Sequence, residues 1–475
     1  MTIVTYRTKP CAPRIASNPL PEEKTLDPTT ALHRLAALLV LGAALGAQAA
    51  NRIYPDTAAP CNTTLQACID GAGSGDRIVL VTDSYIAEDV LIRKNLTLEP
   101  GQAQPSVRSV TALASTADVE VTVRGLTSRG GASRVRGFLE PGGGNLKLTV
   151  TGSTLVGKDF NAALEIVISN KTGRYGRAQA LFEGNTVSQS VAGSNCAPAI
   201  AAHAFNPGLS ATLARNAVTA THLGQCAAIG LYGAGAPAAG AWTLDAQVRQ
   251  NTVRGSGADA GIQVRNGPGG AQVRATVADN LVAGSGFADG LSALADNANG
   301  SADVRLLNNT VVDAPTGLRA TARTDLGARL TGVVANNLFA HHASGAMVLE
   351  NVPDLRDHHN LVFASTPAPG ARPDGAGTRH GNPSFANAAA GDYRLRADSD
   401  AIDHGDDTAV DSADGRDLDG QPRRVRTVDM GAYEFQGQAM PPSVVNSVPA
   451  TGPWALGWVA AMLALAAGWH LRRRG

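Results

Sequence analysis

The sequence has 475 residues, with 40 basic and 40 acidic side chains, so its formal net charge is zero at neutral pH. That balance gives no reason to expect a nucleic acid as partner, because nucleic-acid-binding domains concentrate positive charge. Aromatic residues make up only 4% of the chain, whereas it contains 53 glycines. Small residues, frequent turns and scattered valines favour an all-β repeat protein over a helical one.

Residues 1–49 are predicted to be an N-terminal leader that contains a secretory signal peptide. His33 and Arg34 precede the apolar run 35–45, and the small residues of the AQA stretch at 47–49 supply a cleavage site. This order of positive, apolar and small residues is typical of signal peptides. The mature chain is therefore expected to be exported.

Residues 50–110 are predicted to hold the N-terminal cap and the first coils of a repeat domain. Within the stretch 61–101 the informative pieces are the amphipathic run 65–72, the GDRI turn at 75–78, Tyr85 and the LTL phrase at 96–98. These pieces resemble the start of pectate-lyase-like β-helix proteins. The resemblance implies a short helix that covers the open end of the coil stack, where strand edges would otherwise be exposed. A disulfide between Cys61 and Cys68 would pin this cap.

Residues 111–380 contain an internal repeat, which decides the expected fold. Each copy centres on a polar anchor, with an apolar residue two positions after it and, in all but the last copy, another three positions before it. The anchors are Ser153, Asn185, Asn216, Asn251, Asn280, Asn309, Asn337 and Asn360. A single copy cannot bury its inner face, whereas stacked coils can, because each strand then pairs with its equivalent in the next coil. The prediction is an all-β fold, a single-stranded right-handed parallel β-helix (solenoid) with an N-terminal helical cap.

The anchor asparagines are expected to be structural. In a stack of coils they lie one above another, and stacked amides can satisfy each other's hydrogen bonds. Asn308-Asn309-Thr310 also fits the glycosylation pattern N-x-[ST]. We interpret that match as coincidental, because the export signals are of a bacterial type.

Four cysteines follow the predicted leader, and an even number in an exported chain suggests two disulfides. Cys196 lies 11 residues after Asn185, and Cys226 lies 10 residues after Asn216, so both occupy nearly the same place in consecutive coils. Neighbouring strands are ~4.8 Å apart, which suits the separation of Cα atoms in a disulfide. Stacking therefore predicts a bond between Cys196 and Cys226.

Residues 381–437 are predicted to cap the C-terminal end of the β-helix. The informative phrases are DYRL at 392–395, the run 399–405, DLDGQPR at 417–423 and VDMGAYE at 428–434. They resemble the signature of choice-of-anchor Q proteins, a family of exported bacterial β-helix proteins. The resemblance implies export and a C-terminal sorting signal, and it implies no established reaction.

A linker and sorting motif are predicted at 438–452, followed by a transmembrane or sorting helix with a basic tail at 453–475. The phrase that contains Val448, Pro449 and Trp454 resembles the IPTL-CTERM type of anchor, and it can also be read as a variant LPxTG motif. A plain membrane helix is the third interpretation, because about 18 mostly apolar residues approach the length that spans a bilayer. All three place the β-helix outside the cytoplasmic membrane, and a sorting signal implies a processing protease as partner.

The sequence shows neither the calcium-binding carboxylates of a lyase nor the paired aspartates of a polygalacturonase-type hydrolase. The nearest catalytic candidates are Asp313, His341 and His342. Asp313 and His341 lie four residues after their anchors and should stack on adjacent coils. An acid beside a histidine can do acid–base chemistry, although a solvated turn is the more frequent meaning of such a pair.

No cofactor is expected, with calcium as the alternative. The acidic run that contains Asp414, Asp417 and Asp419 includes the phrase DLDG, which resembles half of a calcium-binding loop, but the terminal glutamate of such a loop is missing. Capping and turn roles are the main interpretation of these aspartates.

These predictions together describe an exported β-helix protein at the cell surface or outside the cell. The expected function is that of an envelope or extracellular binding or scaffold protein, with polysaccharide as its partner. The alternative is a polysaccharide lyase or glycoside hydrolase with a divergent active site. A fold does not decide between them, because function depends on the chemistry of a particular site.

Overall fold

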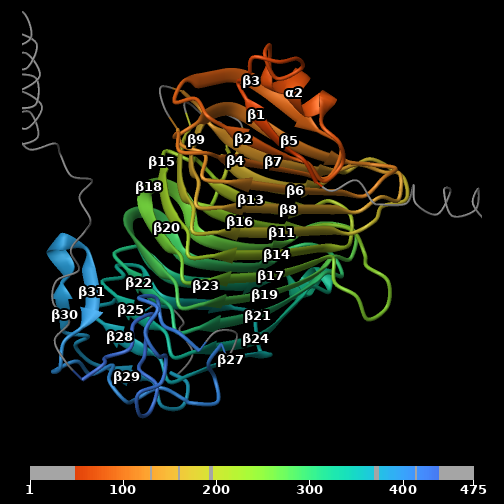
Figure 1. Cartoon of the computed structure of the whole chain (residues 1–475). Helices are drawn as coiled ribbons and strands as arrows, with labels where there is room; N and C mark the ends of the chain where they lie inside the picture. The colour runs from red at the N-terminus through yellow and green to blue at the C-terminus, as the bar shows by residue number, and fades with distance from the viewer. Residues whose placement is uncertain are drawn as a thin grey trace, which may run out of the picture. The chain divides into compact units, whose positions relative to one another are not determined.

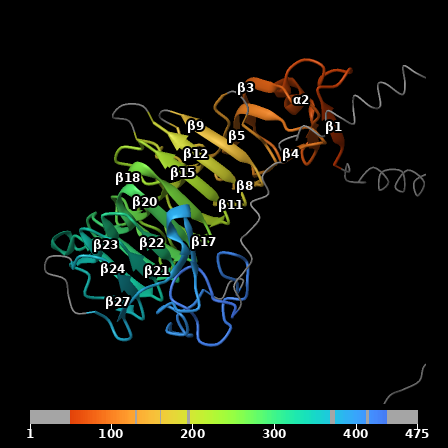
Figure 2. The ribbon, with the colours of Figure 1, turned by 90° about the vertical axis from the view of Figure 1, so that its left-hand side faces the viewer.

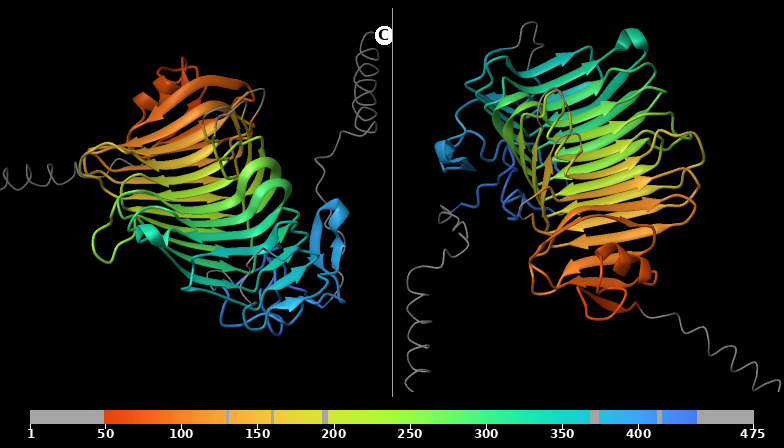
Figure 3. Two further views of the ribbon diagram at one scale, coloured as in Figure 1. Left: turned by 180° about the vertical axis from the view of Figure 1, so that it is seen from behind. Right: turned by 90° about the horizontal axis from the view of Figure 1, so that it is seen from above.

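The chain forms a stack of parallel β-coils. The computed structural model describes residues 49–437, apart from 129–130, 159–160, 192–195, 368–373 and 412–414. One face of the coils, which we call face A, is a sheet of 12 strands that follow one another down the stack and run in the same direction (Figures 1 and 3). The strands of face A are β1 (Asn51–Tyr54), β2 (Arg77–Leu80), β4 (Leu96–Pro100), β6 (Val119–Arg124), β8 (Leu146–Thr151), β11 (Ala178–Glu183), β14 (Leu209–Ala214), β17 (Leu244–Arg249), β19 (Gln272–Ala278), β21 (Ser301–Leu307), β24 (Arg329–Ala335) and β27 (Leu355–His358).

The remaining strands of the coils form a second sheet of 17 strands, in which two faces can be distinguished. Face B follows the anchor asparagines and contains β9 (Thr154–Lys158), β12 (Thr186–Ser190), β15 (Ala217–Thr221), β22 (Thr310–Val312), β25 (Leu338–Ala340), β28 (Leu361–Phe363) and β29 (Arg379–His380). Face C contains β3 (Tyr85–Ile92), β5 (Ser106–Ala114), β7 (Arg134–Leu139), β10 (Leu164–Ile168), β13 (Ile200–Ala204), β16 (Ile229–Gly233), β23 (Thr316–Ala322) and β26 (Gly345–Glu350). Two long strands, β18 (Thr252–Asn266) and β20 (Leu281–Ala295), pass through both faces.

The other elements are short. They are α2 (Leu65–Gly71), the 3-10 turns η1 (Thr324–Leu326) and η2 (Ala388–Ala390), and an antiparallel hairpin of β30 (Phe385–Asn387) and β31 (Asp392–Leu395). The chain is thus a right-handed parallel β-solenoid of about 10 turns. The prediction of a parallel β-helix built from stacked repeats is confirmed.

Alternation along each strand builds the core of the solenoid. In β19, Val273, Ala275 and Val277 are buried, whereas Gln272 and Arg274 are exposed. The three buried residues pair in register with buried residues of β17, and the same alignment continues into β21. Each coil therefore completes the core of its neighbours, as expected for repeats that cannot bury their inner face alone.

The only α-helix among the described residues is α2, and its N-terminus is held by two side chains. Thr64 precedes the helix, and its Oγ1 accepts the backbone N–H of Ala67 at 3.0 Å. The carboxylate of Glu88 in β3 accepts the backbone N–H groups of Leu65 and Gln66 at 2.9 and 3.0 Å. These oxygens satisfy N–H groups that have no partner within the helix, and a negative charge favours a helix N-terminus.

Both predicted disulfides are present. Cys61 is joined to Cys68 in α2, with Cα atoms 4.3 Å apart. Cys196 is joined to Cys226, with Cα atoms 5.2 Å apart, directly before the paired strands β13 and β16. The second bond therefore links two consecutive coils, as the spacing of the cysteines from their anchors predicts.

Residues 381–437, which we call the C-terminal segment, pack against face B of the later coils (Figure 2). The outward position that holds Thr154 and Thr186 in early coils holds Leu281, Leu338 and Leu361 in later ones. The threonines are exposed, whereas the leucines are buried in a cluster with apolar residues of the C-terminal segment. An outward apolar side chain needs a cover, and here the end of the same chain supplies it.

Within the described residues, no helix is long and apolar enough to cross a membrane. The transmembrane or sorting helix predicted at 453–475 lies outside those residues, as do the signal peptide and the linker at 438–452.

Candidate functional site

Seven of the eight anchors form a buried asparagine ladder at the corner between faces A and B. The side-chain Nδ2 of each asparagine donates to Oδ1 of the next at 2.9–3.0 Å. The same Oδ1 accepts the backbone N–H of the preceding ladder asparagine at 2.9–3.1 Å. These contacts satisfy the amides within the protein, so the ladder fixes the coils in register and is not a ligand site. The members are Asn185, Asn216, Asn251, Asn280, Asn309, Asn337 and Asn360.

The residue before each ladder asparagine has a left-handed backbone, with φ between 50° and 64°. In the first coil of the ladder this residue is glycine, Gly184, which adopts positive φ without strain. In the later coils it is a residue with a side chain, and we call these residues the left-handed column. They are Arg215, Gln250, Asp279, Asn308, Asn336 and His359.

The left-handed column binds the C-terminal segment. Amide side chains donate to its backbone carbonyls at 3.0 Å, with Gln250 bound to Asp417, Asn308 to Asp429 and Asn336 to Asp406. Asn308 is only 1% exposed. The glycosylation pattern at this residue therefore lies within a buried interface, where a glycan has no room.

The structure brings Asp313 and His341 together, as their equivalent positions in adjacent coils predict. Nδ1 of His341 lies 3.0 Å from Oδ1 of Asp313, and the side chains are 40% and 42% exposed. The hydroxyl of Tyr393 in the C-terminal segment donates to Oδ2 of Asp313 at 3.3 Å. Desolvation and the charge of Asp313 raise the pKa of Tyr393. The three side chains form an acid–histidine pair with a tyrosine at its edge, which is compatible with proton transfer at an exposed surface.

His342, the third catalytic candidate, does not join this pair. Its side chain is fully buried, with Nδ1 2.6 Å from the carbonyl oxygen of Ala314 and Nε2 3.2 Å from that of Val311. Desolvation lowers its pKa, so the neutral form is favoured. The residue fills the corner of a coil.

The candidate calcium ligands are only partly placed. Asp414 lies outside the described residues. Asp417 is buried, and its two carboxylate oxygens accept the backbone N–H groups of Gln421 and Glu434 at 2.7 and 2.9 Å. Asp419 lines a pocket of about 770 Å³ beside the hairpin of β30 and β31. Asp417 thus has the turn-forming role that the sequence favoured, and calcium binding at this run stays a prediction.

A buried cluster of charges lies between the left-handed column and the C-terminal segment. Arg423 is 3% exposed, and its Nε lies 3.5 Å from Asp279 and its Nη2 3.9 Å from Glu434. Desolvation raises the pKa of Asp429 to about 6 and that of Glu434 to about 7, and Arg423 opposes both shifts. One guanidinium therefore balances several carboxyl groups that are costly to bury.

An aromatic stripe crosses the outward side of face C. Following the strand register from β7 to β20, the outward residues are Phe138, Val167, His203, Tyr232, Arg265 and Leu294. Phe205 lies beside it, 37% exposed, with its ring centroid 5.5 Å from that of Tyr232 and 6.2 Å from that of His203. Desolvation lowers the pKa of His203 to about 4. Rings on the outside of a sheet are typical of an interaction surface.

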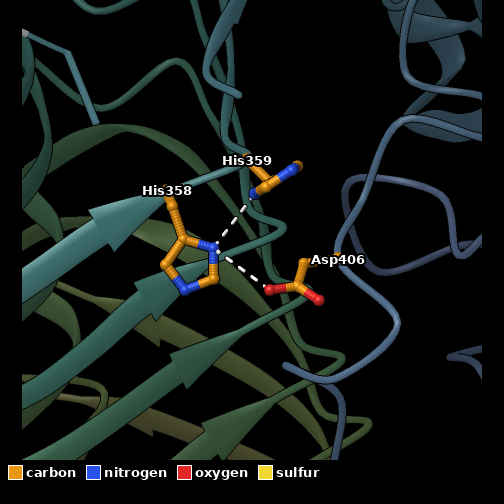
Figure 4. Close-up of side chains that lie close together, drawn as sticks. All are labelled: His358, His359 and Asp406. Carbon is orange, nitrogen blue, oxygen red and sulfur yellow. Dashed lines mark hydrogen bonds and ion pairs between the residues drawn. The ribbon is translucent and has the colours of Figure 1, made fainter. Parts of the chain in front are cut away.

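A second unpredicted cluster joins the end of β27 to the C-terminal segment. Nδ1 of His358 lies 3.1 Å from Nδ1 of His359 and 3.5 Å from Oδ2 of Asp406, and Figure 4 shows both contacts meeting at His358. It is the one group of three or more potential metal ligands in the part of the chain that the structure describes. Hydrogen bonds from Thr408 lower the pKa of Asp406, and desolvation lowers that of His358.

The sorting-motif residues Val448, Pro449 and Trp454 lie outside the described residues. Comparisons with known proteins assign no family, because no family model matches the sequence and no curated protein is significantly similar to it.

Proposed function

We propose that the chain is an exported bacterial binding or scaffold protein that holds an extended polysaccharide against the aromatic stripe. The observation that carries this proposal is the mutual contact of outward rings from two consecutive coils, with His203 and Phe205 in one coil and Tyr232 in the next. Coils repeat every ~4.8 Å along the stack, so the stripe suits a polymer that lies parallel to the solenoid axis. Sugar rings have apolar faces that pack on aromatic rings and hydroxyls that need polar partners.

The charge beside the stripe favours a neutral polysaccharide over an acidic one. Arg265 forms a two-point ion pair with Asp296, with contacts of 2.6 and 3.3 Å. Arg136, at the other end of the stripe, is paired with Glu165. Because each guanidinium already faces a carboxylate, a uronic acid would compete with an existing partner, whereas hydroxyl groups can add to these pairs.

Export is part of the same proposal. The two disulfides are compatible with an oxidising compartment. The resemblance of 381–437 to choice-of-anchor Q proteins and of the phrase at Val448 to IPTL-CTERM anchors supports surface attachment through a processed C-terminus. In this proposal α2 acts as the cap of the first coils.

A binding screen with product analysis tests the proposed function. We expect immobilised neutral polysaccharides to retain the full-length chain more strongly than immobilised pectate does. We expect no release of soluble sugar. Tyr232→Ala should weaken retention at least about tenfold, because aromatic anchors commonly contribute more than about 1.4 kcal/mol to binding. Trp242→Ala is the matched control, since Trp242 packs on Arg274 of face A, away from the stripe. Equal retention of the Tyr232 and Trp242 variants would refute the stripe as the binding surface.

The alternative function is a polysaccharide hydrolase or lyase centred on Asp313. The contact between Asp313 and His341 favours this alternative. The product analysis in the same screen distinguishes an enzyme from a binding protein. Product release that is abolished by Asp313→Asn and by His341→Ala would establish the enzyme. We expect no release from the parent chain, because glycosidases of the usual type need two carboxyl groups at the scissile bond, whereas the carboxylate of Asp313 contacts His341 and Tyr393.

A further inference from the structure

We propose that His358, His359 and Asp406 bind one divalent transition-metal ion of the zinc type. The two histidines follow one another at the end of β27, and the aspartate belongs to the C-terminal segment. The ion would therefore join the last strand of face A to the segment that covers face B. This inference is independent of the proposed polysaccharide binding, because the aromatic stripe lies on face C.

The separations between the donor atoms fit a metal centre. Zinc binds imidazole nitrogen and carboxylate oxygen at about 2.0–2.1 Å, so two ligands at a tetrahedral angle lie about 3.3 Å apart. The separations from Nδ1 of His358 are 3.1 Å to Nδ1 of His359 and 3.5 Å to Oδ2 of Asp406, on either side of that value. All three donor atoms lie within 4.8 Å of one another. Two of the three separations therefore lie within a few tenths of an ångström of the tetrahedral value.

The backbone positions both histidine rings. His358 is the last residue of β27, whereas His359 has φ 50° as a member of the left-handed column. This reversal lets two consecutive side chains face the same point, although side chains of consecutive strand residues normally point to opposite faces. A Cβ atom at Gly377 would lie 2.6 Å from the ring of His359, so glycine at this position leaves the space that the ring occupies.

Asp406 is held with one oxygen directed to the histidines. Its Oδ1 accepts the backbone N–H and the hydroxyl of Thr408 at 2.8 and 2.7 Å. Its backbone N–H donates to Oδ1 of Asn336 at 2.7 Å, and its carbonyl accepts from Nδ2 of the same side chain at 3.0 Å. Hydrogen bonds of this kind orient metal ligands in known sites. Oδ2 remains as the oxygen that faces His358.

The set of donors selects the class of metal. Two imidazoles and one carboxylate suit Zn²⁺, Co²⁺ and Ni²⁺, whereas Ca²⁺ and Mg²⁺ prefer sites made of oxygen. The side chains of His358 and Asp406 are 23% and 25% exposed, so an ion has access from solvent and a water molecule can fill a fourth position. Two imidazole ligands therefore do not suit calcium at this cluster.

The test is titration of the full-length chain, stripped with a chelator, with Zn²⁺ in a calorimeter and with Co²⁺ by visible absorption. We expect a single saturable site that binds either Zn²⁺ or Co²⁺. Zn²⁺ should raise the melting temperature of the protein, and Ca²⁺ should not compete for the site. His359→Ala and Asp406→Asn should each weaken Zn²⁺ binding at least tenfold. Asp406→Asn keeps an acceptor for Thr408, so this variant should fold even if the histidine variant does not.

His380→Ala is the matched control, because His380 forms an exposed pair with Asp374 at 2.7 Å, and no third ligand joins this pair among the residues that the structure describes. It should bind Zn²⁺ like the parent chain. The proposal is overturned if the parent chain shows no saturable site, if His380→Ala loses the site, or if folded Asp406→Asn binds with unchanged affinity. The last result would mean that His358, His359 and Asp406 contact one another at the surface but do not bind a metal ion.

Discussion

Replacing Asn309 by alanine is expected to lower the free energy of unfolding by about 3–5 kcal/mol. Oδ1 of Asn309 accepts both the backbone N–H and the side-chain Nδ2 of Asn280, and its own Nδ2 donates to Val277 and to Asn337. Alanine removes all four bonds at a position that is fully buried. Buried polar groups that lose their partner cost about 1–3 kcal/mol each, because no water replaces the lost bond.

The neighbouring residue supplies the control for this prediction. Asn308→Gly removes one side-chain hydrogen bond, to the carbonyl of Asp429, and glycine tolerates the positive φ at this position. We expect a loss of about 1 kcal/mol, confined to the C-terminal segment. Chemical denaturation followed by circular dichroism measures both variants. If Asn309→Ala were no less stable than Asn308→Gly, the ladder would not be the element that holds the coils together.

The ladder was predictable from sequence because its members recur with the period of the coil. The same register predicts that Asp313 lies beside His341, and the structure places them 3.0 Å apart. Position within a repeat is enough when both partners belong to the repeat. Tyr393, which completes that cluster, lies outside the repeat and 80 residues from Asp313, so no periodicity points to it.

The sequence of the repeats changes in the coils that the C-terminal segment covers, but this change becomes visible only when equivalent positions of the coils are aligned. The position before the ladder is glycine at 184 and becomes Gln250, Asn308 and Asn336 in later coils. Leucine occupies the outward position of face B only in later coils, at Leu281, Leu338 and Leu361, whereas Thr310 keeps the threonine of the earlier coils. Both changes occur where the later part of the chain packs, but neither identifies the segment that covers them.

The two unpredicted sites depend on outward side chains. His203 and Tyr232 belong to strands whose alternation was visible, yet their stacking requires the pairing of β13 with β16. His358 and His359 occur where the last repeat departs from the apolar pattern. Their partner Asp406 approaches only through the fold of the C-terminal segment. The periodicity of the sequence therefore cannot predict tertiary contacts between a repeat and a segment outside the repeats.

Arg423→Met is expected to release the C-terminal segment from the solenoid at alkaline pH. Arg423 donates from Nη2 to the carbonyls of Asp429 and Gly431 at 2.9 and 2.6 Å, and it faces the carboxyl groups of Asp279 and Glu434. Removing one partner of a buried charge cluster typically costs about 3–5 kcal/mol, because the remaining charges lose their compensation. Hydrogen exchange should report the loss in residues 381–437, and the asparagine ladder should remain protected.

The pH dependence of this loss has a definite sign. Glu434 has a pKa of about 7 in the folded protein against an ordinary value of 4.5, and for Asp429 the values are about 6 and 3.8. Raised carboxyl pKa values mean that the folded state binds more protons than the unfolded state, so stability falls as pH rises through this range. Arg423 lowers both pKa values, so its removal raises them further. The deficit of the variant relative to the parent should therefore be largest at pH 8 and shrink towards pH 5, where the carboxyl groups can be protonated.

Arg424→Met is the control for Arg423→Met. It shows whether the loss of stability comes from removing a buried charge or from removing an arginine at any position. Arg424 is 50% exposed and pairs with Asp407 at the surface, so its removal should cost less than about 1 kcal/mol at every pH. Comparing each variant with the parent at the same pH cancels the titration of other groups, including His203. A deficit of Arg423→Met that grows on acidification, or one no larger than that of Arg424→Met, would mean that the buried guanidinium does not hold the C-terminal segment in place.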